Sequence, residues 1–151
     1  MIILGLGSNL GDREHNLRAA IDLINQNLFK DIRKSKTIAT PAMMPENAPA
    51  SWNIAFLNMA ISGELQNPIT PQRFLVEIKK IEAQLGRVPS ERWAPRVIDI
   101  DILSWDNEVI DEPELQIPHI GIASREFVRV PFLELAPDWI NPRTGLRLNQ
   151  S

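Results

Sequence analysis

The order in which helix-like and strand-like spacings of apolar residues follow one another is the feature that most constrains how this chain can fold. One helix face is formed by four residues spaced by four, three and four positions: Leu17, Ile21, Ile24 and Leu28. The spacing predicts an amphipathic helix over residues 13–28, with Asp12 as its N-cap.

A second helix is predicted to follow Thr70. Its buried stripe consists of four apolar residues: Phe74, Ile78, Ile81 and Leu85. Thr70 is a suitable N-cap, Pro71 fits the first helical position, and Gly86 fits the end of the helix.

Strand patterns surround these two helices. They cover four segments: residues 2–7, 31–39, 53–63 and 97–103. The order strand, helix, strand, strand, helix, strand predicts an α+β fold with a ferredoxin-like βαββαβ core, in which the helices cover one face of an antiparallel sheet. The proline-rich remainder is expected to be mostly irregular, with a hairpin near 105–110 and a helical turn near 131–136, and it could cover the other face as an extension of an α/β sandwich.

The amino-acid composition excludes several classes of site and of protein. The 151 residues fit a single domain over 1–151, and the absence of cysteine excludes disulfides, thiolate metal sites and a cysteine nucleophile. No apolar run approaches the roughly 20 residues that span a membrane, and the N-terminus lacks the pattern of a signal peptide. A net charge of -3 argues against a general nucleic-acid binder. We therefore expect a cytoplasmic protein with a small-molecule ligand.

Two aspartates in the last predicted strand are the strongest candidates for chemistry. Asp99 and Asp101 alternate with isoleucines, so their carboxylates point the same way, roughly 7 Å apart. Neighbouring carboxylates repel one another, and a divalent ion such as Mg²⁺ relieves that repulsion. Arg92 and Arg96 lie just upstream, as a triphosphate site requires. An isolated pair of this kind also occurs on the solvated face of a strand.

Other candidates depend on their context. His119 could donate to a phosphate oxygen, and Arg125 follows six residues later; without the other motifs, a loop histidine that binds no ligand would be the favoured interpretation of His119. Phe56 and Asn58 share one strand face, and an aromatic ring beside an amide suits a flat heterocycle with polar edges. Phe56 in the core and Asn58 at a strand end is the alternative.

The glycine-rich turn over residues 5–11 keeps two other functions open. It resembles a loosely spaced dinucleotide fingerprint, which allows a dinucleotide-dependent reductase, although no series of parallel strand–helix units accompanies it. A non-catalytic ferredoxin-like module that binds RNA or metabolites is the second alternative, and the acidic balance of the chain disfavours it.

Taken together, the motifs resemble the 6-hydroxymethyl-7,8-dihydropterin pyrophosphokinase family of the folate pathway. The resemblance runs from Gly7 to the region 131–137, and its most specific part is Arg92-Trp93-Ala94-Pro95-Arg96-Val97-Ile98-Asp99-Ile100-Asp101. The other matching segments are Gly7-Ser8-Asn9-Leu10, Thr40-Pro41, Phe56-Leu57-Asn58, Ile81-Glu82, Gly86-Arg87, Pro118-His119 and Arg125 with Phe127.

The resemblance implies transfer of pyrophosphate from ATP to the pterin hydroxymethyl group by in-line displacement, with release of AMP. It implies that Asp99 and Asp101 hold two Mg²⁺ ions and that Arg92 and Arg96 join them as catalytic residues. ATP-binding residues would be Glu82, Arg87, Arg92, Trp93, Arg96, Ile102, His119 and Arg125. Pterin-binding residues would be Thr40, Pro41, Met43, Phe56, Asn58 and Phe127. No general base is expected.

Three departures from the family pattern concern loops and one lysine. Val88-Pro89-Ser90 lacks a second basic residue, Lys79 stands where a glutamine is common, and the loop over 41–53 is long and rich in proline. The first is expected to weaken loop closure or to change its timing, and none of the three removes a metal ligand. The segment 141–151 fits either the end of a free protein or a linker to another folate-pathway enzyme.

Overall fold

The computed structural model describes residues 1–41, 46–52, 54–88 and 95–148. Its first half contains β1 (Ile2–Ser8), α1 (Arg13–Asn27), β2 (Phe29–Lys34), β3 (Ile38–Thr40), a 3₁₀ turn (Ala50–Trp52) and β4 (Phe56–Leu65). Its second half contains α2 (Pro71–Gln84), β5 (Asp99–Trp105), β6 (Ile110–Glu112), β7 (Leu115–Ile117), α3 (Gly121–Ser124) and α4 (Glu126–Leu135). No helix in these ranges is long and apolar enough to cross a membrane.

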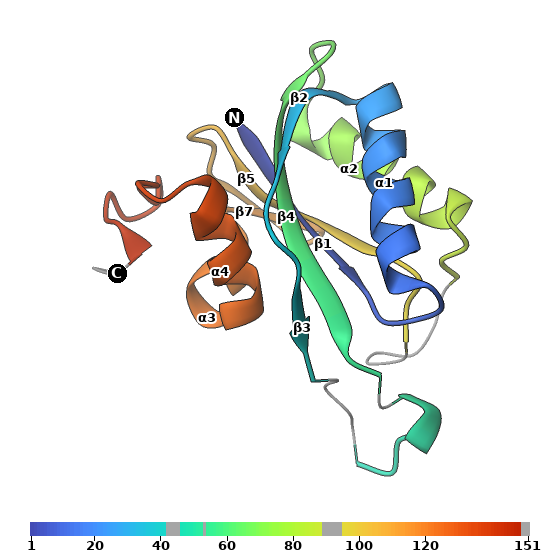
Figure 1. Cartoon of the computed structure of the whole chain (residues 1–151). Helices are drawn as coiled ribbons and strands as arrows, with labels where there is room; N and C mark the ends of the chain where they lie inside the picture. Colours follow the sequence, from blue (N-terminus) through green and yellow to red (C-terminus); the bar gives the residue numbers. More distant parts are fainter. Residues whose placement is uncertain (42–45, 53, 89–94, 149–151) are drawn as a thin grey trace.

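The main sheet has the strand order β2-β4-β1-β5, and β3 also pairs with β4. Every pairing in it is antiparallel. Helices α1 and α2 lie on one face of the sheet, and α3 and α4 lie on the other (Figure 1). The predicted mixed fold with an antiparallel sheet is confirmed. The pairing of β1 also argues against the reductase alternative, because a dinucleotide-binding fold needs parallel strands.

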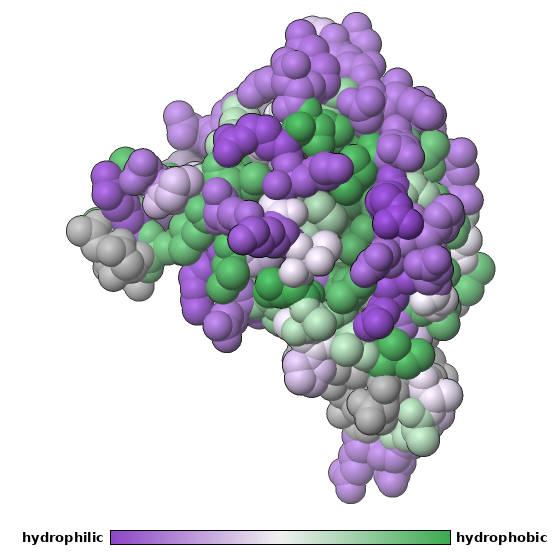
Figure 2. Space-filling model, viewed as in Figure 1, coloured by the Kyte–Doolittle hydropathy of each residue, from purple (hydrophilic) through white to green (hydrophobic). Residues whose placement is uncertain are grey.

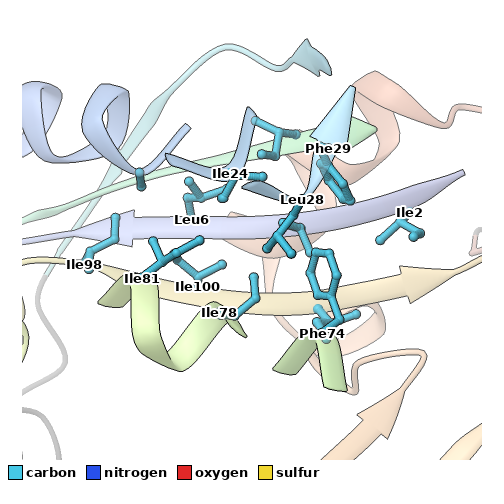
Figure 3. Close-up of a cluster of buried hydrophobic side chains, with 14 of the residues drawn as sticks. Ile2, Leu6, Ile24, Leu28, Phe29, Phe74, Ile78, Ile81, Ile98 and Ile100 are labelled. Atoms are coloured by element: carbon cyan, nitrogen blue, oxygen red, sulfur yellow. The ribbon is translucent and has the colours of Figure 1, made fainter. Parts of the chain in front are cut away.

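The two predicted helices form where their caps and apolar stripes place them. The Asp12 carboxylate accepts a hydrogen bond from the His15 N–H, and the Thr70 hydroxyl accepts one from the Arg73 N–H. Side chains of α2 point toward the apolar face of β1 and β5, where Ile78 and Ile81 lie beside Ile98 and Ile100 (Figure 3). The polar faces of both helices stay outside, and α1 carries a hydrophilic surface (Figure 2).

A second apolar cluster lies under α4 on the opposite face. It contains Ile3, Ala60, Leu103, Ile122, Phe132, Leu135 and Ala136. This cluster covers only one end of that face, which leaves the other end free for a cavity. The expectation that the C-terminal segment covers the second face is confirmed for that end.

Several predicted boundaries are wrong. The strand predicted over 31–39 is two strands, because the Ser35 hydroxyl accepts the Ala60 N–H and breaks the ladder between β2 and β3. The hairpin is β6–β7, five or more residues later than predicted. In place of the helical turn predicted near 131–136, the structure has the longer helix α4, which starts at Glu126 and contains Pro131. Proline removes one helical hydrogen bond, but the packing of Phe132 and Leu135 maintains the helix.

Gly63 is expected to tolerate no side chain. A Cβ at this position would lie 2.4 Å from the ring of Phe29, which is fully buried. Gly63→Ala should therefore lower the free energy of unfolding by roughly 2 kcal/mol, as overpacking of a core does. Urea denaturation would measure the loss.

Phe29→Leu supplies the internal control for this clash. Because it removes the ring, the double variant should be less destabilised than the sum of the two single losses. Strict additivity would show that the clash is not the cause.

Candidate active site

The cavity lies on the sheet face that α4 covers only in part. Side chains alternate along a strand, so this face receives Phe56 and Asn58 from β4 and Asp99 and Asp101 from β5. Gly5 and Gly7 of β1 lie between these two pairs: Gly7 is opposite both Asn58 and Asp99, and Gly5 is opposite Asp101. The strand pairing thus brings the acidic pair and the aromatic–amide pair into one cavity.

Gly7 keeps the floor of this cavity open. A Cβ there would lie 2.9 Å from the Asn58 Oδ1 atom and 3.4 Å from the Phe56 ring. A side chain at position 7 would fill the space between the carboxylates and the Asn58 amide. The lack of one leaves room for a flat ligand that reaches across β1.

Asp101 has a strongly perturbed pKa. Its side chain lines the cavity and is exposed there, while nearby protein atoms partly desolvate the carboxylate. This desolvation, with the charges of Asp99 and Glu82, raises the pKa of Asp101 to about 7. Lys79 and Arg87 act in the opposite direction. A proton or a cation would therefore stabilise the negative charge that Asp99, Asp101 and Glu82 bring together.

Asp99 is held by two arginines. The Nη1 atom of Arg87 lies 2.9 Å from its Oδ1, and the Nη1 atom of Arg96 lies 3.6 Å from its Oδ2. Among the described residues, no group of three or more histidine and acidic side chains could enclose a metal ion. A pair of carboxylates at the edge of a phosphate site still fits Mg²⁺, which keeps several waters and phosphate oxygens among its ligands.

Arginines and a histidine form a cationic wall beside the acids. Arg96, His119 and Arg125 all line the cavity. Backbone contacts fix Arg96, because its N–H donates to the Asn9 Oδ1 at 2.8 Å and its carbonyl accepts from the Asn9 N–H at 3.1 Å. Asn9 is only 1% exposed, so this clamp is shielded from water.

One hydrogen bond of the His119 ring and the surroundings of that ring indicate where its proton lies and whether it is charged. Its Nδ1 accepts from the Gly121 N–H at 2.9 Å, so the proton of the neutral ring belongs on Nε2. Burial, followed by the charge of Arg125, lowers the pKa of His119. The ring is therefore neutral near pH 7 and suited to donate one hydrogen bond.

Aromatic and amide groups form the other side of the cavity. Phe56 comes from the sheet and Phe127 from α4. The Asn58 Nδ2 donates to the Thr40 hydroxyl at 2.9 Å, while its Oδ1 lies over the bare Gly7. A ring with N–H groups along one edge could be held here by stacking and by hydrogen bonds to Oδ1.

The structure brings most of the residues chosen from the sequence into this cavity. The lining includes Thr40, Pro41, Phe56, Asn58, Arg96, Asp99, Asp101, His119, Arg125 and Phe127. Three others do not line it: Glu82 and Arg87 lie behind Asp99, and the Ile102 side chain, 4% exposed, packs into the core on the opposite sheet face. Met43, Arg92 and Trp93 lie outside the described residues.

Sequence reasoning missed several lining residues. Gly5, Leu103 and Val128 also face the cavity, and Leu6 and Met59 lie at its lining although they belong to the core cluster on the opposite sheet face. Leu103 could have been found, because it is two residues beyond Asp101 in the same strand. Val128 could not, since α4 was expected to begin after it.

A cavity that joins an acidic pair and a cationic wall to an aromatic–amide surface is typical of enzymes that transfer a phosphoryl-type group from a nucleotide to a flat acceptor. The family model described as 7,8-dihydro-6-hydroxymethylpterin-pyrophosphokinase matches residues 3–137. The chain belongs to this family, a class of ATP-dependent pyrophosphokinases in folate synthesis.

Similar proteins carry matching names. A 2-amino-4-hydroxy-6-hydroxymethyldihydropteridine pyrophosphokinase of Methylorubrum extorquens is 37% identical over 138 residues, which cover 91% of this chain and 83% of that protein. A protein of the same name from Aquifex aeolicus is also 37% identical, over 93% of this chain and 83% of its own length. A folate synthesis bifunctional protein of Chlamydia caviae is 34% identical over 95% of this chain, which spans only 32% of that relative.

Proposed function

We propose that this chain transfers the pyrophosphoryl group of ATP to the hydroxymethyl group of 6-hydroxymethyl-7,8-dihydropterin and releases AMP. The observation that carries the proposal is a single cavity with phosphate-binding chemistry on one side of Gly7 and ring-binding chemistry on the other. The names of the similar proteins support the same reaction.

Asp99 and Asp101 are the residues that would hold Mg²⁺, with two ions expected from the family resemblance. The raised pKa of Asp101 shows a carboxylate short of positive charge, which fits this role. Bound Mg²⁺ would neutralise phosphate oxygens and make the pterin hydroxyl easier to deprotonate. The acid pair also lies across β1 from Asn58, so a ring held there would present its substituent toward the metal site.

Arg96, His119 and Arg125 would bind the phosphates of ATP. Their positive or donor groups line the same wall, and Arg96 is fixed through Asn9. Arg87 would join them once it leaves Asp99. Arg92 and Trp93 are expected to act on the nucleotide side, and Ile102 could contribute only through its backbone at the edge of β5.

The reaction needs little covalent help from the protein. The hydroxyl oxygen would attack the β-phosphorus, the bond from that phosphorus to the α-phosphate oxygen would break, and the hydroxyl proton would pass to solvent. His119 does not suit a general base, because its Nδ1 already accepts a hydrogen bond and its Nε2 carries the proton. Positioning and charge neutralisation would supply most of the rate.

Phe56 and Phe127 would stack against the two faces of the pterin, and Asn58 would accept from its N–H groups. Thr40 fixes the Asn58 amide, and the segment through Pro41 and Met43 would complete the polar edge. This arrangement explains why one side of the cavity is apolar although the other side is charged.

We further propose that the sheet and its two long helices form a ferredoxin-like core within a single domain over 1–151. The strand order β2-β4-β1-β5, with α1 after β1 and α2 after β4, supports this arrangement. We also propose a cytoplasmic location and a possible fusion to another folate-pathway enzyme. The folate synthesis bifunctional proteins among the relatives support the fusion.

Metal affinity should depend on pH through Asp101. In the metal-free protein its pKa of about 7 means that a proton occupies the site below that pH. Mg²⁺ must displace this proton, so apparent affinity should fall by up to about tenfold per unit as pH drops below 7 and should level off above it. Titration calorimetry between pH 5.5 and 8.5 would measure it. The same affinity at pH 5.5 and 8 would contradict Asp101 as a ligand.

The function itself is tested by mixing the protein with Mg²⁺, ATP and the hydroxymethyl-dihydropterin and separating the nucleotides by chromatography. AMP should form only when the pterin is present, with no ADP. Oxidation of NAD(P)H without metal would support a reductase instead, and binding without turnover would support a non-catalytic module.

A further inference from the structure

Glu82 is a buried acid that lies close to the candidate active site without lining it. It belongs to α2, on the opposite face of the sheet from the cavity, and is 2% exposed. A buried carboxylate is costly unless it is paired and hydrogen-bonded. Its contacts therefore indicate what it does.

One oxygen of Glu82 makes two strong contacts. Oε2 accepts from the Ile100 N–H at 2.8 Å and from the Arg87 Nη1 at 2.6 Å, while Oε1 lies 3.4 Å from the Lys79 Nζ. β5 is an edge strand of the main sheet, so within the described part of the chain no neighbouring strand receives the outward N–H of Ile100. Glu82 satisfies that donor.

Both the Ile100 N–H and the Arg87 guanidinium connect Glu82 with the acid pair, Asp99 and Asp101. Ile100 stands between Asp99 and Asp101, so fixing its backbone fixes the direction of both carboxylates. The same Nη1 atom of Arg87 that contacts Glu82 also lies 2.9 Å from the Asp99 Oδ1. Glu82 and Asp99 thus share one guanidinium.

We propose that Glu82 is a positioning residue for the acid pair: it anchors β5 between the two aspartates and shares Arg87 with Asp99, so that Asp99 remains available to a cation. The proposal rests on the proposed function only in taking the acid pair as a metal site. Without the charge of Glu82, Arg87 would pair with Asp99 alone and compete with the metal. Glu82 then acts through Arg87 and Ile100 rather than by touching the nucleotide.

Glu82→Gln tests this role, because the amide oxygen can still accept from Ile100 while the charge that holds Arg87 is lost. The Mn²⁺ dissociation constant of the full chain would be measured from the electron paramagnetic resonance of free Mn²⁺. The measurement is made at pH 8, where Asp101 is largely ionised. We expect binding weakened roughly tenfold or more, as for other residues that support metal ligands. The double variant Glu82→Gln, Arg87→Gln should recover most of the affinity.

Two single variants complete the test. Glu77→Gln removes a half-buried acid of the same helix that pairs with Arg73 and Lys80, and it should bind Mn²⁺ like the unmodified chain. Arg87→Gln alone keeps Glu82 and should not lose affinity, which covers the case in which Glu82→Gln fails to fold.

The possible failures are distinguishable. Equal Mn²⁺ affinity in Glu82→Gln and the unmodified chain would overturn the positioning role, as would a loss of affinity that the second substitution does not restore. An unmodified chain that binds no Mn²⁺ would instead contradict the acid pair as a metal site.

Discussion

Asp101→Ala is expected to lower the rate of AMP formation by about a thousandfold or more while the protein stays folded. The reason for the loss is that a bound metal supplies several kilocalories per mole of charge stabilisation, and 1.4 kcal/mol corresponds to a tenfold change in rate. Asp99→Ala should cause a similar loss. Steady-state AMP formation with saturating ATP and pterin would measure both.

The two alanine variants should differ in their effect on the stability of the folded chain. The pKa of Asp101 is raised in the folded chain, so its contribution to stability is present below its ordinary pKa and is lost as pH rises through about 7. At pH 8 without metal, Asp101→Ala should therefore not lower the melting temperature. Asp99→Ala should lower it slightly, since Arg87 and Arg96 lose a partner.

Asp111→Ala is the matched control for these variants. It removes an exposed aspartate that pairs with Arg143 and does not line the cavity, and it should keep normal turnover. Near-normal rates in Asp99→Ala or Asp101→Ala would rule out the metal role.

Phe127→Ala should weaken pterin binding by roughly tenfold to a hundredfold and ATP binding by far less. Stacking of a heterocyclic base on an aromatic side chain contributes about 1–3 kcal/mol. Phe127 lines the cavity together with Phe56, whereas the phosphate-binding candidates Arg96 and His119 lie on other segments and Arg125 precedes α4. Calorimetric titration of each ligand separately would give the two affinities.

Val130→Ala serves as the control, because Val130 is an exposed residue of the same helix. It should leave both affinities unchanged. Equal losses of pterin and ATP binding in Phe127→Ala would point to displacement of α4 rather than to lost stacking.

Much of the site could be predicted because strands impose a period of two. That period alone places Asp99 and Asp101 on one face of β5, and Phe56 and Asn58 on one face of β4. Caps and apolar stripes likewise predicted α1 and α2 closely. These features depend on local spacing, which a sequence displays directly.

The rest depends on contacts between distant segments. The clamp between Asn9 and Arg96 joins residues 87 positions apart, and the strand pairing that sets Gly7 between Asn58 and Asp99 has no local signature. The helical turn was expected near 131–136, whereas α4 begins at Glu126, and tertiary packing maintains the helix on both sides of Pro131.

We propose that Asp99 and Asp101 of β5 together hold the metal that joins nucleotide and pterin. A crystal of the protein with Mn²⁺, a non-hydrolysable ATP analogue and the pterin would test it through the anomalous scattering of the metal. Anomalous peaks are expected at coordination distance from Asp99 and Asp101, between the phosphates and the pterin hydroxyl. Metal bound by the phosphates alone, with both carboxylates unliganded, would contradict it.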